Sequence, residues 1–416
     1  MIKKIRPKSE FSRNVLTLMT GTTIAQAVPI AISPILTRLY SPKDFGVFAL
    51  FVSIVAIFGS IVGARYELAI MLPRKDEDAI NIVALCLLLV SIMSFVMLFI
   101  VVVLNAQITN LLGNQEMSTW LYLTPVSVFL IGFFNTLKYY NNRIKNYKDI
   151  AKASIYKSLI LVIVQIAVGV IKPGVTGLIS GSLVSSFFAN IKLLKNTVAN
   201  NKLPLIKLLK IIALAKRYRD FPKYSMWATL INTLSNSLVD VLISILYNAA
   251  TLGHYSLVQR VIGAPTLLIG SAIGQVFFEQ AAKEEQQTGK AVKAFKSTVK
   301  KLLLIGIPTF LILFVTVGDL FALVFGEEWR VAGEYAQVLL PMMFIKFISS
   351  PLSSMLFIGN KQKINLYAQG IFIVSVFFAF ILCDTIKDTL LFLSISFSLV
   401  YIYYFYVSAR VAKVIS

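Results

Sequence analysis

The stretch Leu39–Leu50 (LYSPKDFGVFAL) returns in altered form about half a chain later, as Leu246–Leu257 (LYNAATLGHYSL). Leucine, tyrosine, glycine and leucine recur at matching positions of the two copies, and long apolar segments flank both of them. A recurrence of this kind indicates an internal duplication. We therefore expect two halves of similar connectivity, each with a short turn at this stretch, in which Gly46 and Gly253 permit a tight bend.

The composition is that of an integral membrane protein. Hydrophobic residues make up 57% of the 416 residues and charged residues only 14%, whereas soluble domains carry about 25% charged residues. The net charge of +21 does not indicate a nucleic-acid partner, because the basic residues lie between apolar segments instead of forming one patch. Cys86, Cys383 and the single histidine, His254 in the second turn, form no disulfide framework or metal-binding spacing. We expect neither a metal nor another cofactor.

Twelve apolar segments are long enough to cross a membrane. A helix of about 20 residues spans the hydrocarbon core, where the backbone must satisfy its own hydrogen bonds. The sequence thus predicts an all-α integral membrane protein with twelve transmembrane helices. The predicted spans cover residues 14–36, 45–64, 79–104, 117–137, 154–171, 174–191, 226–246, 255–277, 302–318, 335–357, 366–382 and 389–407.

The distribution of lysine and arginine predicts the orientation, since cytoplasmic loops are enriched in these residues. With the N-terminus in the cytoplasm, most of the 40 lysine and arginine residues fall in cytoplasmic segments. The external turns then hold only Arg38, Lys43, Lys172, Arg330 and Lys387. Both termini are therefore predicted to be cytoplasmic.

The longest cytoplasmic connection separates two predicted lobes. Its residues 203–217 are apolar, with Lys207, Lys210 and Arg217 at helical spacing. This pattern is typical of an amphipathic helix that lies on a membrane surface. The predicted domains are a first lobe at residues 1–200, a linker at residues 201–225 and a second lobe at residues 226–416.

Three charged side chains stand out inside the predicted spans: Asp240, Arg260 and Lys346. A charge at bilayer depth costs about 2.5 to 3.5 kcal/mol on insertion scales, so each is a candidate functional residue. Asp240 and Arg260 lie at similar depth on consecutive antiparallel helices, where a structural ion pair and a role in a transport pathway are both open. Lys346 has no acidic residue within its span, and we expect it to face a water-filled cavity in preference to snorkelling or pairing with an unidentified partner.

Polar residues form a stripe on the first predicted helix of each half. Such stripes often only join neighbouring helices, but their equivalent positions favour a shared cavity. Pro29 and Pro34 are also expected to break or kink the first helix. The stripes comprise Thr22, Gln26, Pro29, Ser33 and Thr37 in the first half and Thr229, Thr233, Asn236 and Asp240 in the second.

Several motifs, taken together and in this order, resemble those of the polysaccharide-unit flippases. These belong to the multidrug/oligosaccharidyl-lipid/polysaccharide flippase superfamily. Each motif is short, and the resemblance rests on their order over nearly the whole chain. The motifs are Arg65–Arg74 (RYELAIMLPR), Leu252–Leu257 (LGHYSL), Arg260, Pro265, Gln275–Phe277 (QVF), Phe325–Trp329 (FGEEW) and Ser350–Leu352 (SPL).

The resemblance implies two pseudo-symmetric six-helix lobes around a central cavity, with alternating access across the bacterial inner membrane. It implies as cargo an undecaprenyl-pyrophosphate-linked oligosaccharide, moved from the cytoplasmic to the periplasmic leaflet for O-antigen or capsule assembly. The implied partners are membrane lipids and other polysaccharide-assembly proteins. The coupling is open: either Asp240 responds to an H⁺ or Na⁺ gradient, or transport is driven only by consumption of the cargo outside.

Fixed cations in a wet cavity would offset the dehydration of a pyrophosphate headgroup. Arg260 and Lys346 are the main candidates for this role. Arg65 and Arg38 are candidates for the inner and outer mouths of the pathway. Arg65 beside Glu67 also fits an interfacial anchor, and Arg38 at a helix end fits a snorkelling residue.

Two other functions are weighed against this one. A cation-coupled exporter of amphipathic drugs from the same superfamily would use Asp240 as its ion site, although more acidic residues are then expected. A membrane enzyme such as a polymerase or ligase is disfavoured, because no external loop is long. The only acidic cluster, at residues 76–78, is interpreted as a solvated connection.

Overall fold

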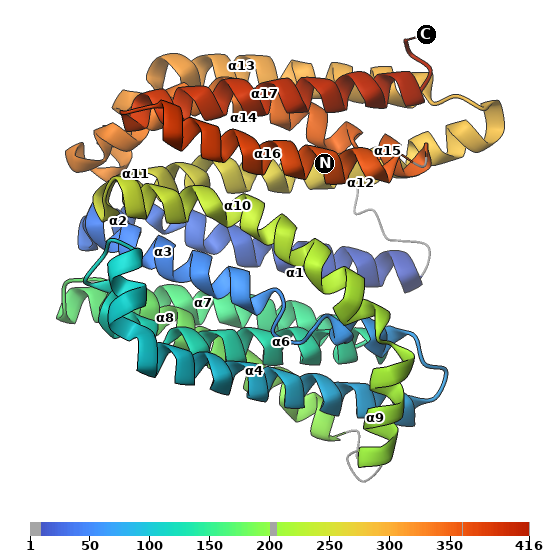
Figure 1. Cartoon of the computed structure of the whole chain (residues 1–416). Coiled ribbons are helices and arrows are strands. Elements are labelled where there is room, and N and C mark those ends of the chain that lie inside the picture. Colours follow the sequence, from blue (N-terminus) through green and yellow to red (C-terminus); the bar gives the residue numbers. More distant parts are fainter. Residues whose placement is uncertain (1–9, 200–205, 360, 416) are drawn as a thin grey trace, which may run out of the picture. The chain divides into compact units, whose positions relative to one another are not determined.

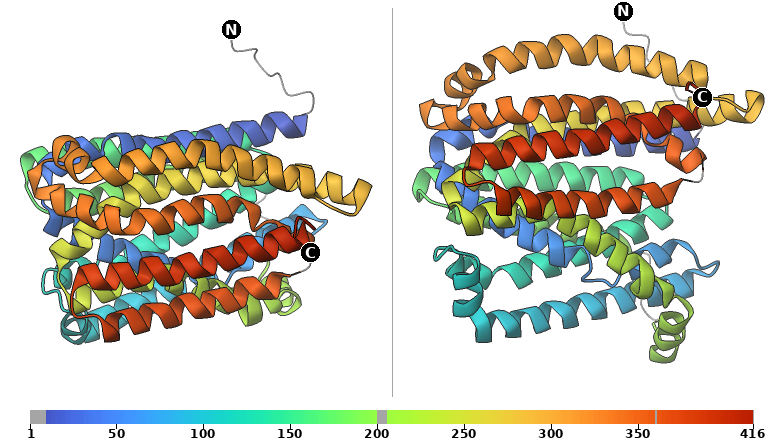
Figure 2. Two further views of the ribbon diagram at one scale, coloured as in Figure 1. Left: turned by 90° about the horizontal axis from the view of Figure 1, so that it is seen from above. Right: turned by 45° about the horizontal axis from the view of Figure 1, so that its top comes forward.

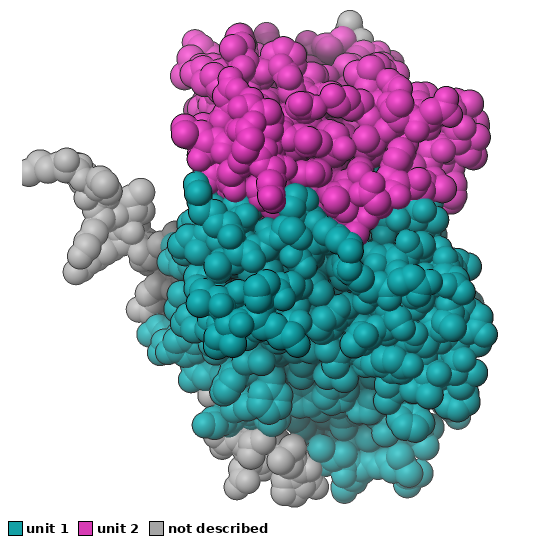
Figure 3. Space-filling model, turned by 90° about the vertical axis from the view of Figure 1, so that its left-hand side faces the viewer, with its two compact units in different colours: residues 1–245 teal, residues 246–416 magenta. Residues whose placement is uncertain are grey.

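Two compact units make up the computed structural model, which describes residues 10–199, 206–359 and 361–415. Unit 1 covers Met1–Ile245 and unit 2 covers Leu246–Ser416 (Figure 3). The described part of the chain is helical and contains no strand. The basic residues 3–8 and residues 203–205 of the predicted linker helix lie outside the described residues. The lobe boundaries near residues 200 and 226 stay a prediction.

In unit 1, α6 packs against α3, α4 and α8, and α7 packs against α1 and α8. These helices run alongside one another (Figure 1). Val128, Leu137 and Tyr140 of α6 are each at most 1% exposed, so that α6 forms the centre of the unit. The helices are α1 (Glu10–Ala31), α2 (Ser33–Leu39), α3 (Pro42–Gly59), η1 (Tyr66–Met71), α4 (Asp76–Leu111), α5 (Met117–Leu121), α6 (Thr124–Arg143), α7 (Tyr147–Ile171), α8 (Thr176–Ala199), α9 (Leu208–Arg217), η3 (Phe221–Ser225) and α10 (Met226–Leu246).

In unit 2, α14 is the central helix and packs against α11, α12, α13 and α17 (Figure 2). A Cβ atom on Gly333 of α14 would lie 2.7 Å from the Cα of Gly318 in α13. The two backbones therefore approach closely, as small residues allow between membrane helices. The helices are α11 (Ala249–Val258), η4 (Gln259–Gly263), α12 (Ala264–Thr288), α13 (Val292–Phe325), η5 (Glu327–Trp329), α14 (Arg330–Leu352), α15 (Met355–Ile358), α16 (Gln362–Leu382) and α17 (Ile386–Val411).

Ten helical segments among the described residues are long and apolar enough to cross a membrane. Each coincides with one of the predicted spans, which confirms a multi-pass helical membrane protein. The two predicted spans outside these ten fall on α1 with α2, and on α16, whose apolar part is the shorter segment Tyr367–Leu382. Twelve spans therefore stay a prediction.

The predicted interruption of the first helix is confirmed. α1 ends at Ala31 and α2 begins at Ser33, with Pro34 in the first turn of the new helix. A proline there has no amide hydrogen to offer to the preceding turn. The Ser33 hydroxyl donates instead to the carbonyl of Pro29, at 2.9 Å.

The repeated stretches are helix starts, and the predicted role of their glycines is wrong. Ser41 caps α3, since its hydroxyl accepts from the Asp44 amide at 3.3 Å. Asn248 caps α11 through its side-chain oxygen, which accepts from the Thr251 amide at 2.8 Å. Gly46 and Gly253 lie inside these two helices and are buried. Ser41 and Asn248 mark the starts of the two helices, because a capping side chain accepts from the first free amides of a helix. The chain therefore turns before these two residues.

The tyrosine of each copy contacts two consecutive long helices that follow it in its own unit. In unit 1 the hydroxyl of Tyr40 donates to the carbonyl of Gln165 in α7. Cβ atoms on Gly169 of α7 and Gly177 of α8 would lie 2.6 and 2.0 Å from that hydroxyl.

In unit 2 the hydroxyl of Tyr247 lies 2.7 Å from that of Thr389 in α17. The ring of Tyr247 also packs on Phe380 of α16, with the ring centroids 6.2 Å apart. The repeated Leu-Tyr sequence thus makes corresponding contacts in both units.

The predicted amphipathic linker helix is α9, and it docks on α4. Lys210 pairs with Glu77 at 2.5 Å, and the Lys207 amide donates to the Asn81 side chain at 2.8 Å. Leu208 and Leu209 on the outer side are 69% and 82% exposed. An apolar face of this kind suits the predicted position at a membrane surface.

The Tyr40 contact is expected to make Gly177 intolerant of any side chain. In Gly177→Ala the new Cβ displaces the Tyr40 hydroxyl, and overpacking of this kind costs about 1 to 3 kcal/mol. We expect a thermal midpoint several degrees lower for the purified protein in detergent. Gly370→Ala is the matched control, because Gly370 is helical and open space surrounds its Cβ position. Equal midpoints for the two variants would contradict this packing.

Candidate functional site

Asp240 of α10 is held by Ser53 of α3. The Ser53 hydroxyl donates to Asp240 Oδ2 at 2.6 Å, and both residues belong to unit 1. Ser53 is 5% exposed and lies in an otherwise apolar stretch of α3. A carboxyl group in a spanning helix needs such a partner, because an unsatisfied polar group is costly there. The predicted pair between Asp240 and Arg260 joins residues of different units and stays a prediction.

The other residues of the α10 stripe bond to their own helix. The hydroxyls of Thr229 and Thr233 donate to the carbonyls four residues earlier, at 2.8 and 2.9 Å. The exposed Asn236 side chain donates to the carbonyl and side-chain oxygens of Asn232, at 2.8 and 3.0 Å. The stripe therefore remains a polar surface on α10, with its hydroxyl donors satisfied locally.

Arg65 and Glu67 form a partly buried ion pair between α3 and α4. Arg65 Nη1 lies 3.0 Å from Glu67 Oε1, and the two side chains are 23% and 8% exposed. Ala64 and Arg65 have φ angles of 48° and 63°, a left-handed conformation that non-glycine residues adopt at a cost. Gly63 leaves room for the carboxylate, since its Cβ would lie 3.0 Å from Glu67 Oε2. The backbone is thus bent to place this pair.

Burial raises the pKa of the Glu67 carboxyl above its usual value. The backbone amide of Glu67 and the Arg65 guanidinium oppose that rise. The neighbouring Tyr66 fixes the same turn to α9, because its hydroxyl donates to the Ala215 carbonyl at 2.9 Å. Arg65 therefore lies at a junction of η1, α4 and α9, and its role at the inner mouth of the pathway or as an interfacial anchor stays a prediction.

Lys346 lies on α14, the central helix of unit 2. Its Nζ is 5.8 Å from the centre of the Tyr401 ring of α17, within range of a cation–π interaction. Among the described residues no carboxylate forms an ion pair with Lys346. Ser349, on the same face, donates its hydroxyl to the Ile345 carbonyl at 2.7 Å. Tyr401 thus supplies an aromatic partner that sequence reasoning did not identify, while the predicted water-filled cavity stays a prediction.

Arg260 lies in η4, a widened helical turn between α11 and α12. Pro265 follows this turn, lacks an amide hydrogen, and conflicts with the carbonyl four residues before it. The irregular turn thus has a local cause in the sequence. Single π-type turns are frequent at functional sites, and this one places a half-buried guanidinium within a spanning segment.

The remaining predicted site residues lie on surfaces of unit 1. Gln26 is exposed on α1, and Arg38 is exposed in the last turn of α2. Within the described residues, no hydrogen bond or ion pair joins either of them to Asp240 or Arg65. Their predicted roles in the pathway stay predictions.

The acidic cluster at residues 76–78, predicted to be a solvated connection, is the first turn of α4, where the Asp76 side chain is 53% exposed. Asp76 pairs with Arg143 at 3.1 Å and Glu77 with Lys210 at 2.5 Å. Acidic residues are favoured at this position because the first turn of a helix carries positive partial charge.

His254 likewise lies in helix α11, not in a turn. Its ring packs edge-on against Trp329 and Tyr335, with centroid distances of 5.6 and 6.1 Å. The histidine is therefore part of an aromatic cluster in unit 2.

The described residues contain no group of three histidine, cysteine or acidic side chains able to hold a metal ion. What they do contain is a carboxyl on α10 and two cationic side chains on η4 and α14, all within spanning segments.

Comparison with protein families gives one match over most of the chain. A family described as "Polysaccharide biosynthesis protein" matches residues 35–334. The teichuronic acid biosynthesis protein TuaB of Bacillus subtilis is 28% identical over 153 residues, which are 36% of this chain and 32% of TuaB. The lipopolysaccharide biosynthesis protein WzxC of Escherichia coli is 25% identical over 161 residues, 37% of this chain and 33% of WzxC. The aligned region spans about a third of each relative.

Solved structures share the fold. The lipid II flippase MurJ in an inward closed conformation superposes with a TM-score of 0.74 and 11% identity, over 95% of this chain and 87% of MurJ. An inward-facing multidrug resistance transporter of the MATE family gives a TM-score of 0.66 and 14% identity, over 95% of both chains. At these identities the likeness concerns the fold alone.

The Glu67 carboxyl is expected to make stability depend on pH. Because its pKa is raised in the folded protein, its favourable contribution is complete at acidic pH and is lost as the pH rises through that pKa. The Glu67→Gln variant should therefore have the same thermal midpoint as the wild type near pH 4 and a higher thermal midpoint than the wild type towards about pH 8. Exposed Glu328→Gln serves as the control and should leave the profile unchanged. A wild type that gains stability relative to Glu67→Gln with rising pH would show that the Arg65 pair dominates.

Proposed function

The chain belongs to the family of polysaccharide biosynthesis proteins, and from this premise we propose that it is a flippase for lipid-linked oligosaccharides. The proposed cargo is an oligosaccharide repeat unit on undecaprenyl pyrophosphate. The protein moves it from the cytoplasmic to the periplasmic leaflet of the bacterial inner membrane for O-antigen or capsule assembly. Both termini then lie in the cytoplasm, and other polysaccharide-assembly proteins are its partners.

The observation that carries this proposal is Lys346 on the central helix of unit 2, held beside an aromatic ring. A pyrophosphate that enters the membrane loses hydration, and a fixed cation offsets part of that loss. Tyr401 can stabilise the ammonium group of Lys346 in the absence of cargo. Because the ring carries no negative charge, the ammonium group stays available to bind a phosphate. Arg260 on the irregular turn η4 supplies a second cation in the same unit.

Asp240 is proposed as the coupling site. Its hydrogen-bond partner among the described residues, the Ser53 hydroxyl, can donate to a carboxylate or accept from a protonated carboxyl. A group of this kind can carry H⁺ or bind Na⁺ while the chain alternates between its two access states. Alternating access of two six-helix lobes, with boundaries at residues 1–200, 201–225 and 226–416, completes the proposal.

Removal of either cation is expected to stop transport without removing the protein from the membrane. In a strain lacking the gene, Lys346→Gln and Arg260→Gln should reduce surface polysaccharide by about tenfold or more, the effect of losing one charge-assisted hydrogen bond. Lys346→Arg and Arg260→Lys keep the charge and should retain part of the activity. The measurement is surface polysaccharide per cell, together with mass spectrometry of the lipid-linked intermediate.

Lys172→Gln is the matched control, because Lys172 is exposed at the end of α7. It should support normal polysaccharide. Normal polysaccharide from the double variant Lys346→Gln/Arg260→Gln would refute the site. Drug sensitivity of the deletion strain without any accumulated lipid-linked intermediate would instead indicate a multidrug exporter.

Replacement of the Asp240 carboxyl tests the coupling. Asp240→Asn keeps a hydrogen-bond acceptor for Ser53 but cannot exchange a proton. We expect transport by this variant in proteoliposomes to respond about tenfold less to an imposed H⁺ or Na⁺ gradient. The conservative control is Ser53→Thr, which keeps the hydroxyl. An unchanged gradient response in Asp240→Asn would assign coupling to another group.

A further inference from the structure

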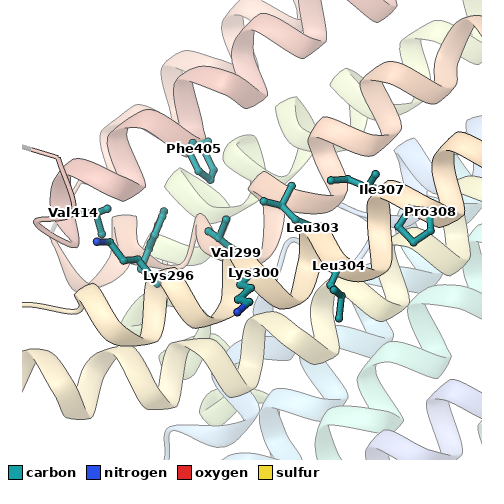
Figure 4. A pocket seen from close by; sticks show the side chains of 10 residues that line it. Lys296, Val299, Lys300, Leu303, Leu304, Ile307, Pro308, Phe405 and Val414 are labelled. Atoms are coloured by element: carbon teal, nitrogen blue, oxygen red, sulfur yellow. The ribbon is translucent and has the colours of Figure 1, made fainter.

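An apolar groove with two lysines at one end runs between α13 and α17 of unit 2. Its volume is about 710 Å³, within the range of small-molecule sites. Lys296 and Lys300 lie at the end nearest the start of α13, and Figure 4 shows Leu303, Leu304 and Ile307 following them along the helix. Phe405 of α17 lines the same groove. One end is thus cationic, and the rest is hydrocarbon.

Both lysines are exposed, and neither forms an ion pair with any residue that the structure describes. The amides at the start of α13 are already occupied. The Glu284 carboxylate accepts from the amides of Lys293 and Ala294, at 2.9 and 2.7 Å. An anion in the groove is therefore bound by the lysine side chains and not by the helix terminus.

The apolar part has the length of one membrane leaflet. A second cavity of about 230 Å³ shares Ile307 with the groove and continues to Phe310 and Phe314. From Lys300 to Phe310 the helix rises about 15 Å, half of a hydrocarbon core of about 30 Å. Leu304 is 73% exposed on this side of α13, so that the groove opens laterally.

We propose that the groove between α13 and α17 binds one anionic membrane phospholipid. The phosphate lies between Lys296 and Lys300, and one acyl chain lies along Leu303, Leu304 and Ile307. Charge complementarity favours an anionic phospholipid as the occupant. A lipid without net charge is not attracted by the two ammonium groups, and a soluble anion makes no favourable contact with the apolar wall. The site is additional to the proposed transport of a lipid-linked oligosaccharide and does not depend on it.

Photolabelling of the full-length protein in phosphatidylcholine nanodiscs tests this site. The probe is phosphatidylglycerol with a diazirine in its acyl chain, and labelled peptides are mapped by mass spectrometry. We expect labels on α13 and α17. Each lysine at an anionic lipid contributes about fivefold to binding, so Lys296→Gln/Lys300→Gln should weaken labelling by about thirtyfold. Leu304→Trp narrows the apolar part and should also lower labelling, with both lysines in place.

The matched control is Lys361→Gln/Lys363→Gln, which removes the same charge from exposed residues outside the groove. It should label as the wild type does, and equal thermal midpoints should show that all variants are folded. Excess inorganic phosphate should not displace the probe. Equal labelling by a phosphatidylcholine diazirine, or unchanged labelling of Lys296→Gln/Lys300→Gln, would overturn the proposal. Stronger displacement by undecaprenyl phosphate than by phosphatidylglycerol would also overturn it, because the groove would then bind the carrier lipid.

Discussion

A membrane interior offers no water to polar groups, and the chain meets this constraint one side chain at a time. The hydroxyls of Thr229 and Thr233 bond to their own helix, and Asp240 receives the hydroxyl of Ser53. Lys346 lies beside the ring of Tyr401. Ser53 and Tyr401 thus stabilise the charged side chains of Asp240 and Lys346, and neither partner carries an opposite charge. That is the property a binding site for a charged headgroup needs, because a strong internal ion pair would compete with the cargo.

The second organising feature is the repeated Leu-Tyr sequence before a capped helix. Tyr40 and Tyr247 each reach a pair of consecutive long helices of their own unit, through Gln165 in one case and Thr389 in the other. The internal duplication stays a prediction, with which these contacts agree. The surroundings of the two tyrosines differ: glycines in α7 and α8 make room for Tyr40, whereas Phe380 packs against Tyr247.

The sequence predicted the elements better than the contacts. Apolar runs located the spanning helices, since their length is set by the bilayer, and the break near Pro29 and Pro34 followed from the missing proline amide hydrogen. The glycines were misassigned because spacing alone does not distinguish a turn from the first turns of a capped helix. Ser53 and Tyr401 could not be paired with Asp240 and Lys346, since these contacts join helices far apart in sequence. The ion pair between Arg65 and Glu67 was not predicted either, although the two residues are close in sequence.

The central claim is that fixed cations in unit 2 let a pyrophosphate-linked saccharide cross the bilayer. Its most direct test is a reconstituted assay, with the purified protein in liposomes and a lipid-linked oligosaccharide whose sugar reacts with a membrane-impermeant oxidant. With the wild type, the oxidant should reach the lipid of both leaflets within minutes. With Lys346→Gln the oxidant should reach the lipid of the inner leaflet about tenfold more slowly or slower still. In liposomes without protein it should reach only the outer leaflet. If the oxidant reached the same share of the lipid-linked oligosaccharide with the wild type as in protein-free liposomes, under every imposed ion gradient, the proposed transport would be contradicted.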